Sequence, residues 1–144
     1  MSAFTNDLKT LLADVVTMYF VAHGYHWNVE GQDFSQYHAL FADIYEDVYS
    51  SVDPIAENIR KMGEYAPFTL SKFTDLRTVE AKEVSPEPQA MAKALLKVNE
   101  DVIKSIKKAF NSAVKADEQG IANFLSERED MHKKWSWQLT ASTK

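Results

Sequence analysis

The chain has 144 residues and a mass of 16.4 kDa, the size of a single globular domain. Hydrophobic residues make up 45% and charged residues 26%, which excludes a disordered chain, and four Gly and four Pro leave little turn material for a many-stranded β-fold. Cysteine is absent, which excludes disulfides, thiolate metal sites and a Cys nucleophile and fits a cytoplasmic protein. The net charge of −5 argues against general nucleic-acid binding, and no stretch resembles a signal peptide or a membrane span.

Four segments show the 3.6-residue period of amphipathic helices, and they cover residues 2–27, 33–62, 88–114 and 117–139. In the second segment Asp33 is a candidate N-cap, and Gly63 marks the end of the helix. Pro54 lies inside this segment, which predicts either a kink or two abutting helices with Asp53 capping the second.

The stretch between the second and third of these segments is long enough to cross a helix bundle, and it predicts a short helix over residues 70–76. Two helical hairpins joined by one long crossover indicate an all-α fold of the ferritin-like four-helix type, with residues 1–144 forming one domain. An ordinary up-down bundle would need no connection of that length.

Three of the four histidines, His23, His26 and His38, lie close together in the sequence. A short break between the first two helices places the end of one beside the start of the other, so we expect His26 and His38 to approach each other. Neutral imidazoles in pairs are competent ligands for iron, zinc or copper. The alternative for each histidine is an ordinary core or surface position.

The second helix carries five carboxylates that are candidates to complete a metal site: Asp43, Glu46, Asp47, Asp53 and Glu57. Asp53 and Glu57 are one turn apart and project from one face, although a solvated helix face explains that spacing equally well. His38 and Asp53 are separated by roughly 22 Å along a straight helix, with an angular offset of about 60°. One metal therefore cannot contact both within one chain. An antiparallel two-fold packing of second helices predicts a composite site, present twice per dimer.

A di-iron centre inside the bundle requires a Glu-x-x-His pair from each of two helices. The chain contains one such pair, Glu129 with His132 on the fourth predicted helix. The sequence therefore does not support a centre within one subunit, and we interpret Glu129 and His132 as surface or interface residues.

Two motifs and the C-terminal end carry a resemblance to a known family. Residues 23–41 read H-G-Y-H-W-N-V-x-G-x-x-F-x-x-x-H-x-L-F, residues 53–63 read D-x-I-A-E-x-I-R-x-M-G, and residues 134–139 read K-W-x-W-x-L. The sequence closely resembles the Dps family, the miniferritins named for DNA protection during starvation. The resemblance implies a hollow dodecamer that oxidises iron(II), preferentially with hydrogen peroxide, at inter-subunit dinuclear ferroxidase centres and stores iron(III) inside.

Carried over by position, the ligands would be His26 and His38 from one subunit and Asp53 and Glu57 from its two-fold neighbour, with Trp27 beside the centre. The resemblance makes iron the bound metal, for which zinc can substitute.

Two departures from the family pattern bear on function. The family usually has a carboxylate four residues after the second histidine, where this chain has Ala42. Glu46 is the better-placed substitute, and Asp43, rotated by about 100°, is the weaker one. A catalytically degenerate structural or metal-binding cage is therefore the alternative to an active ferroxidase. The Lys-rich N-terminal tail of some members is also missing, so DNA binding is expected to be weak or absent.

Overall fold

The computed structural model describes residues 2–144, and within them it contains five helices and no strand. The helices are α1 (Ala3–Asn28), α2 (Phe34–Lys61), α3 (Leu70–Leu76), α4 (Pro88–Lys115) and α5 (Gln119–Ser142). Each lies within a few residues of its predicted position, and the short α3 covers the predicted residues. No helix of the described residues is long and apolar enough to cross a lipid bilayer.

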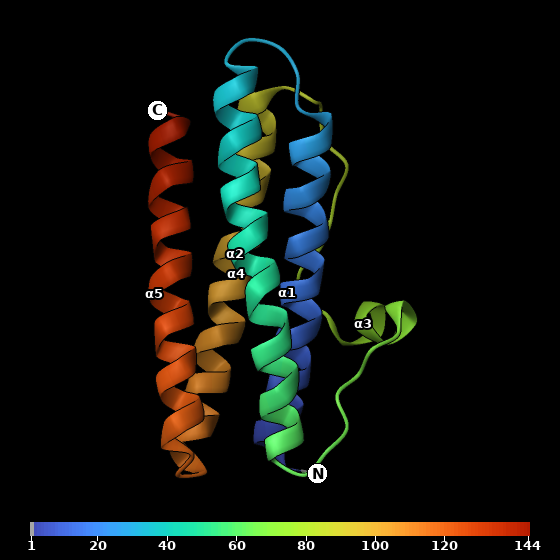
Figure 1. Ribbon diagram of the computed structural model, residues 1–144, viewed down its shortest axis with the longest axis vertical. Helices are drawn as coiled ribbons and strands as arrows, with labels where there is room; N and C mark the ends of the chain where they lie inside the picture. The colour runs from blue at the N-terminus through green and yellow to red at the C-terminus, as the bar shows by residue number, and fades with distance from the viewer. Residues whose placement is uncertain (1) are drawn as a thin grey trace.

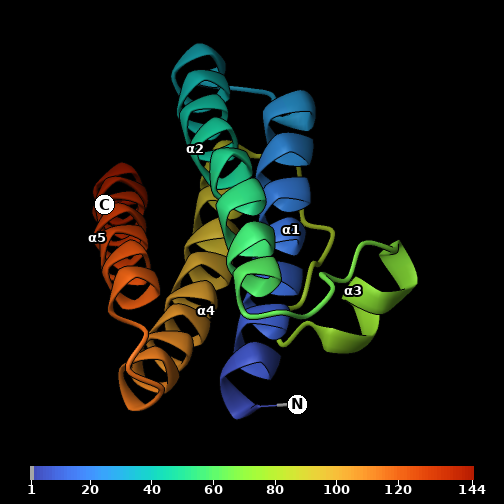
Figure 2. The ribbon, with the colours of Figure 1, turned by 60° about the horizontal axis from the view of Figure 1, so that its bottom comes forward.

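The four long helices form two hairpins, α1 with α2 and α4 with α5, which turn at opposite ends of the molecule (Figure 1). The crossover between them runs back along the length of the bundle, so α2 and α4 point in the same direction (Figure 1). The short α3 projects from the side of the bundle next to α1 (Figure 2). This arrangement confirms the expected ferritin-like bundle with one long crossover.

Residues with positive φ angles lie at both ends of α2. Asp33 is the N-cap residue, as expected, but it has a φ of 63° and its side chain makes no capping hydrogen bond. At the other end Gly63 has a φ of 87°, a conformation that favours glycine. The amides of Gly63 and Glu64 donate to the carbonyls of Arg60 and Ile59, which is the hydrogen-bond pattern of a Schellman motif. Between these ends α2 continues through Pro54 as one helix, so the alternative of two abutting helices is wrong.

Side chains from α1, α2, α4 and α5 form one core along the bundle axis. Its largest fully buried members are Leu8, Leu11, Leu12 and Met18 of α1, Phe41, Ile44, Ile55 and Ile59 of α2, and Leu95, Ile106, Leu125 and Leu139 of α4 and α5. Full burial of one such side chain contributes about 1.5–3 kcal/mol. This core holds the α1–α2 hairpin in place.

The buried carboxylate of Asp14 attaches the crossover to the bundle. It accepts hydrogen bonds from the backbone amides of Thr78 and Val79, at 2.7 and 3.0 Å, and from the hydroxyls of Thr78 and Ser105. Asp14 lies on α1, Thr78 and Val79 on the crossover, and Ser105 on α4. One side chain therefore joins three segments that are far apart in the sequence, and its buried charge is compensated by four donors.

Candidate metal centre

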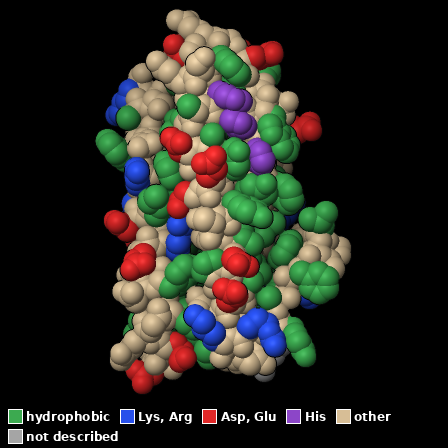
Figure 3. Space-filling model, in the orientation of Figure 1, with side chains coloured by type: hydrophobic (Ala, Val, Ile, Leu, Met, Phe, Trp, Pro, Cys, Tyr) green, Lys and Arg blue, Asp and Glu red, His purple; other side chains and the backbone are tan. Residues whose placement is uncertain are grey.

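The α1–α2 turn brings His26 and His38 into contact. Their rings stack with centroids 3.7 Å apart and an interplanar angle of 15°. Both residues are partly exposed, and the histidines visible in Figure 3 form a group on the surface near the end of the molecule where α1 and α2 join. The hairpin thus produces the expected pairing of the two imidazoles.

Two reciprocal hydrogen bonds determine which nitrogens of the pair carry protons. Nδ1 of His26 lies 2.7 Å from the carbonyl oxygen of His38, and Nδ1 of His38 lies 2.7 Å from the carbonyl oxygen of His26. A carbonyl oxygen only accepts, so both Nδ1 atoms are the donors. The carbonyl of His26 lies in the last turn of α1, where carbonyls lack helical partners. In the neutral rings both Nε2 atoms therefore keep their lone pairs, as metal ligands require.

Aromatic rings surround the histidine pair on one side. Tyr45 stacks on His23 with centroids 3.8 Å apart, and its ring centroid lies 5.3 Å from that of His26. The Trp27 ring lies 4.3 Å from His23 and is 64% exposed. Hydrophobic side chains border the histidines along this face (Figure 3). Trp27 contacts His23, which is not one of the predicted ligands, so its position beside the metal centre stays a prediction.

The predicted carboxylate ligands lie further along α2. Asp53 and Glu57 are exposed, and neither forms a hydrogen bond or ion pair with another residue in the range 2–144. Asp43 and Glu46 are exposed as well. Within the described residues no group of three or more His, Asp or Glu side chains converges as a metal site. The structure therefore brings together the two histidines of the predicted set and leaves the carboxylates pointing to solvent.

Asp47, the fifth candidate carboxylate, is not free to bind a metal. Arg128 donates two hydrogen bonds to its oxygens, at 2.8 and 2.9 Å, and the indole of Trp135 donates a third at 2.8 Å. Burial acts to raise the pKa of Asp47, but the hydrogen bonds from Arg128 and Trp135 outweigh it and hold the pKa below its usual value. Asp47 is therefore a link between α2 and α5.

The interpretation of His132 as a surface or interface residue is wrong. His132 is fully buried, with Nδ1 2.7 Å from the Asn99 side-chain oxygen and Nε2 3.1 Å from Arg128. Since Arg128 only donates, Nε2 accepts and Nδ1 carries the proton. Burial and then the charge of Arg128 lower the pKa of His132 to about 3, so it is neutral at physiological pH. Glu129 is partly exposed and lies 3.6 Å from Lys107, in agreement with a surface position.

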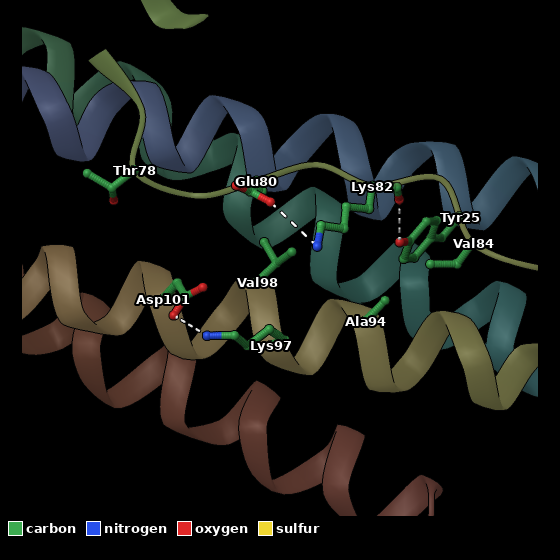
Figure 4. A pocket seen from close by; sticks show the side chains of 9 residues that line it. All are labelled: Tyr25, Thr78, Glu80, Lys82, Val84, Ala94, Lys97, Val98 and Asp101. Atoms are coloured by element: carbon green, nitrogen blue, oxygen red, sulfur yellow. Dashed lines mark hydrogen bonds and ion pairs between the residues drawn. The ribbon is translucent and has the colours of Figure 1, made fainter. Parts of the chain in front are cut away.

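A cavity of about 360 Å³ lies between the crossover and α4 (Figure 4). Its charged side chains are paired, with Lys82 3.6 Å from Glu80 and Lys97 2.9 Å from Asp101. The hydroxyl of Tyr25 donates a hydrogen bond to the backbone carbonyl of Lys82. None of the side chains that line the cavity is a histidine, so the imidazole pair remains the stronger candidate for metal binding.

Comparison with known proteins identifies the family. The ferritin-like domain family matches residues 5–143. The chain is 30% identical over 135 residues to the DNA protection during starvation protein of Helicobacter pylori. The matched residues cover 93% of this chain and 94% of that protein. The chain belongs to the Dps family of ferritin-like proteins. Solved Dps structures share its fold. The Dps protein from Vibrio cholerae superposes with a TM-score of 0.93 at 24% identity, and the match covers 98% of this chain and 89% of the Vibrio chain. The Dps protein from Bacillus brevis superposes with a TM-score of 0.90 at 24% identity, and the match covers 100% of this chain and 99% of the Bacillus chain.

One feature of this Dps chain next to the histidine pair did not emerge from the sequence. The hydroxyl of Tyr19 forms a hydrogen bond of 2.9 Å with Nδ1 of His23, and the Tyr19 ring lies 6.2 Å from that of Tyr45. Tyr19 and His23 are four residues apart on α1, a spacing that places two side chains on one helix face. That spacing was the available signal, but only the packing of α2 on α1 adds Tyr45.

Proposed function

We propose that this Dps chain is a miniferritin that binds iron(II), oxidises it with hydrogen peroxide and stores iron(III) in a hollow dodecamer in the cytoplasm, with residues 1–144 as one ferritin-like domain. The observation that carries the proposal is the stacked pair His26 and His38, whose Nδ1 atoms are fixed by backbone carbonyls. A ligand set oriented in this way holds its Nε2 lone pairs ready for a metal without prior rearrangement.

The remaining ligands of the proposed centre come from a second subunit. Because His38 and Asp53 lie roughly 22 Å apart along α2, a two-fold partner whose α2 runs antiparallel places its own Asp53 and Glu57 at the histidine pair. Both carboxylates are exposed and have no partner among residues 2–144, as this arrangement requires. Each dimer then carries two identical centres.

Exposed aromatic side chains support burial of this face in an assembly. Trp27, Phe34 and Tyr49 are 64%, 40% and 60% exposed, and all three come from the α1–α2 hairpin. Large exposed apolar groups close together are typical of protein interfaces. We infer that the second subunit covers this face when it supplies its carboxylates.

The proposed chemistry is a two-electron reduction of peroxide. Two iron(II) ions give up one electron each, the O–O bond breaks, and two protons complete two molecules of water. Mixed imidazole and carboxylate ligands suit iron(II), and zinc(II), which accepts the same ligands, should compete for the centre. Because Ala42 supplies no ligand one turn after His38, we propose that one iron position of the dinuclear centre is tight and the other loose, with Glu46 or, less favourably, Asp43 as substitute.

The alternative is a structural or metal-binding shell with a degenerate centre, and Ala42 is the feature that favours it. Anaerobic titration of iron(II)-loaded protein with hydrogen peroxide, followed by stopped-flow absorbance, separates the two. We expect oxidation of two iron(II) per peroxide, with the rate largely lost in His38→Ala and Glu57→Ala. Glu80→Ala, which removes an exposed carboxylate of the crossover, is the matched control.

Light scattering must show that all these variants remain assembled, so that a loss of rate reports the centre. Equal rates in the parent protein, His38→Ala and Glu57→Ala would refute the ferroxidase proposal and leave the structural shell as the better account.

A further inference from the structure

The Glu129 and His132 pair of α5 does not act as a unit, because its two side chains have different surroundings. Glu129 lies at the surface, 3.6 Å from Lys107, whereas His132 is fully buried. Inside the bundle His132 contacts Arg128 of its own helix, and Arg128 in turn contacts Asp47 of α2. A carboxylate, an imidazole and a cation therefore meet at a place that the proposed ferroxidase centre does not use.

One nitrogen of the Arg128 guanidinium lies between two groups that can bind a metal. It donates to a carboxylate oxygen of Asp47 at 2.8 Å and lies 3.1 Å from Nε2 of His132. The second terminal nitrogen donates to the other oxygen of Asp47 at 2.9 Å. Carboxylate oxygens and imidazole nitrogens are ligands that iron(II), zinc(II) and cobalt(II) accept in proteins. The positive charge at this position comes from a side chain of the protein.

Both of these groups are held by further hydrogen bonds, as the ligands of a metal usually are. Nδ1 of His132 lies 2.7 Å from the side-chain oxygen of Asn99, which fixes the tautomer that has a lone pair on Nε2. The Asn99 amide nitrogen donates to the His132 carbonyl and to the Ser136 hydroxyl, and these bonds hold the Asn99 oxygen toward the imidazole. The indole of Trp135 donates to Asp47 at 2.8 Å. The two candidate ligands are thus oriented by groups other than the guanidinium.

The guanidinium is less completely hydrogen-bonded than the groups that hold it. Its Nε atom is the one buried side-chain nitrogen or oxygen within residues 2–144 that has no hydrogen-bond partner. A buried donor without an acceptor costs free energy. The side chains of Arg128 and Asp47 are 12% and 14% exposed, so solvent has limited access to the pair. Arg128 therefore fills the position as a cation but lacks the full set of acceptors that a guanidinium can use.

We propose that the guanidinium of Arg128 takes the place of a divalent metal inside the four-helix bundle and thereby excludes iron(II) from the interior of the subunit. Asp47 and His132 are the ligands that the metal would otherwise use. A metal binds such ligands at about 2.0–2.2 Å, so each side chain has to move inward by about 1 Å once the guanidinium is gone, and water completes the coordination. Because Arg128 is part of the chain, it competes with free metal at a high effective concentration. This inference does not depend on the ferroxidase function proposed above.

Removal of the guanidinium should open the interior of the bundle to metal. The experiment compares His38→Ala with the double variant His38→Ala/Arg128→Ala, because His38→Ala disables the proposed centre at the surface. Each assembled protein is titrated with cobalt(II), whose visible absorption changes when protein ligands replace water. We expect one additional cobalt(II) per subunit in the protein that lacks Arg128, and we expect this cobalt to be lost when His132→Gln is added. Lys107→Ala, which removes the cation next to Glu129, is the matched control and should bind no additional cobalt(II).

Methylguanidinium chloride provides a second measurement, because it supplies the missing head group without the attachment to the chain. At millimolar concentration it should displace cobalt(II) from protein that lacks Arg128. Tetramethylammonium chloride carries the same charge but has no N–H donors, and it should not displace the metal. If light scattering shows that Arg128→Ala does not assemble, cobalt(II) or methylguanidinium should restore assembly, because a ligand that binds only the folded chain stabilises it.

The outcomes separate this inference from the ferroxidase proposal. Equal cobalt(II) binding with and without Arg128 overturns the inference, and so does additional cobalt(II) that survives His132→Gln or that methylguanidinium does not displace. An Arg128→Ala protein that neither cobalt(II) nor methylguanidinium can assemble overturns it as well. None of these results bears on the ferroxidase proposal, because His38→Ala and Glu57→Ala test that proposal with Arg128 in place.

Discussion

Replacement of the buried His132 by Gln should weaken the dependence of stability on pH. In the folded chain His132 is neutral, with Nδ1 donating to Asn99 and Nε2 accepting from Arg128. A Gln side chain offers one amide donor and one carbonyl acceptor, so it retains both types of hydrogen bond but does not titrate. The difference in the pH dependence of the free energy of unfolding between the parent protein and His132→Gln therefore reports the binding of one proton to His132.

The magnitude follows from the two pKa values of His132. Burial and then the charge of Arg128 lower its pKa to about 3 in the folded state, whereas an unfolded chain has a pKa of about 6.5. At a pH above the His132 pKa of the unfolded chain, neither the folded nor the unfolded chain binds the proton, so the free energy of unfolding is unaffected. At a pH between the two pKa values only the unfolded chain binds the proton. The free energy of unfolding then falls by about 1.4 kcal/mol per pH unit for each subunit, until the pH reaches the pKa of His132 in the folded chain. Between about pH 7.5 and about pH 4.5 the loss is roughly 3 kcal/mol.

Urea unfolding at several pH values, followed by far-ultraviolet circular dichroism at equal subunit concentration, measures this difference. The free energy of unfolding of the parent protein should fall more steeply below about pH 6.5 than that of His132→Gln. Parallel pH profiles for the two proteins across this range would show that His132 is not held neutral by its buried surroundings, and the reasoning would be refuted.

Three further predictions concern the crossover, the metal centre and DNA. Asp14→Ala leaves four donors of the crossover and α4 without their acceptor, and it should lower the free energy of unfolding by about 3 kcal/mol or more in urea titrations; a loss below about 1 kcal/mol would contradict the anchoring role. Ala42→Asp adds a carboxylate one turn after His38 and should speed peroxide-driven iron(II) oxidation in stopped-flow measurements; an unchanged rate would argue against a loose second iron position. Duplex DNA should bind weakly in gel-shift assays at physiological salt, because the chain has a net charge of −5; submicromolar affinity with a steep salt dependence would overturn this prediction.

Local sequence patterns determined the helices and one half of the candidate centre. The apolar periodicity placed all four long helices, and the crossover helix was predicted over the residues that form α3. The contact between His26 and His38 was also predictable, because a short turn between two helices keeps the end of the first close to the start of the second. Gly63 marked the end of α2 through its positive φ, a property of the residue type itself.

The tertiary structure alone decided the roles of the polar residues inside the bundle. Asp14, Asp47 and His132 look like ordinary members of amphipathic helices, and Asp47 was one of the five carboxylates on the second helix that the sequence offered for a metal site. Asp14 is buried because donors from the crossover and α4 meet it, and Asp47 is occupied because Arg128 and Trp135 reach it from α5. A polar group tolerates burial only where its hydrogen-bond partners are present. Those partners lie far away in the sequence, so the packing of the helices determines which carboxylates are buried links and which remain available to a metal.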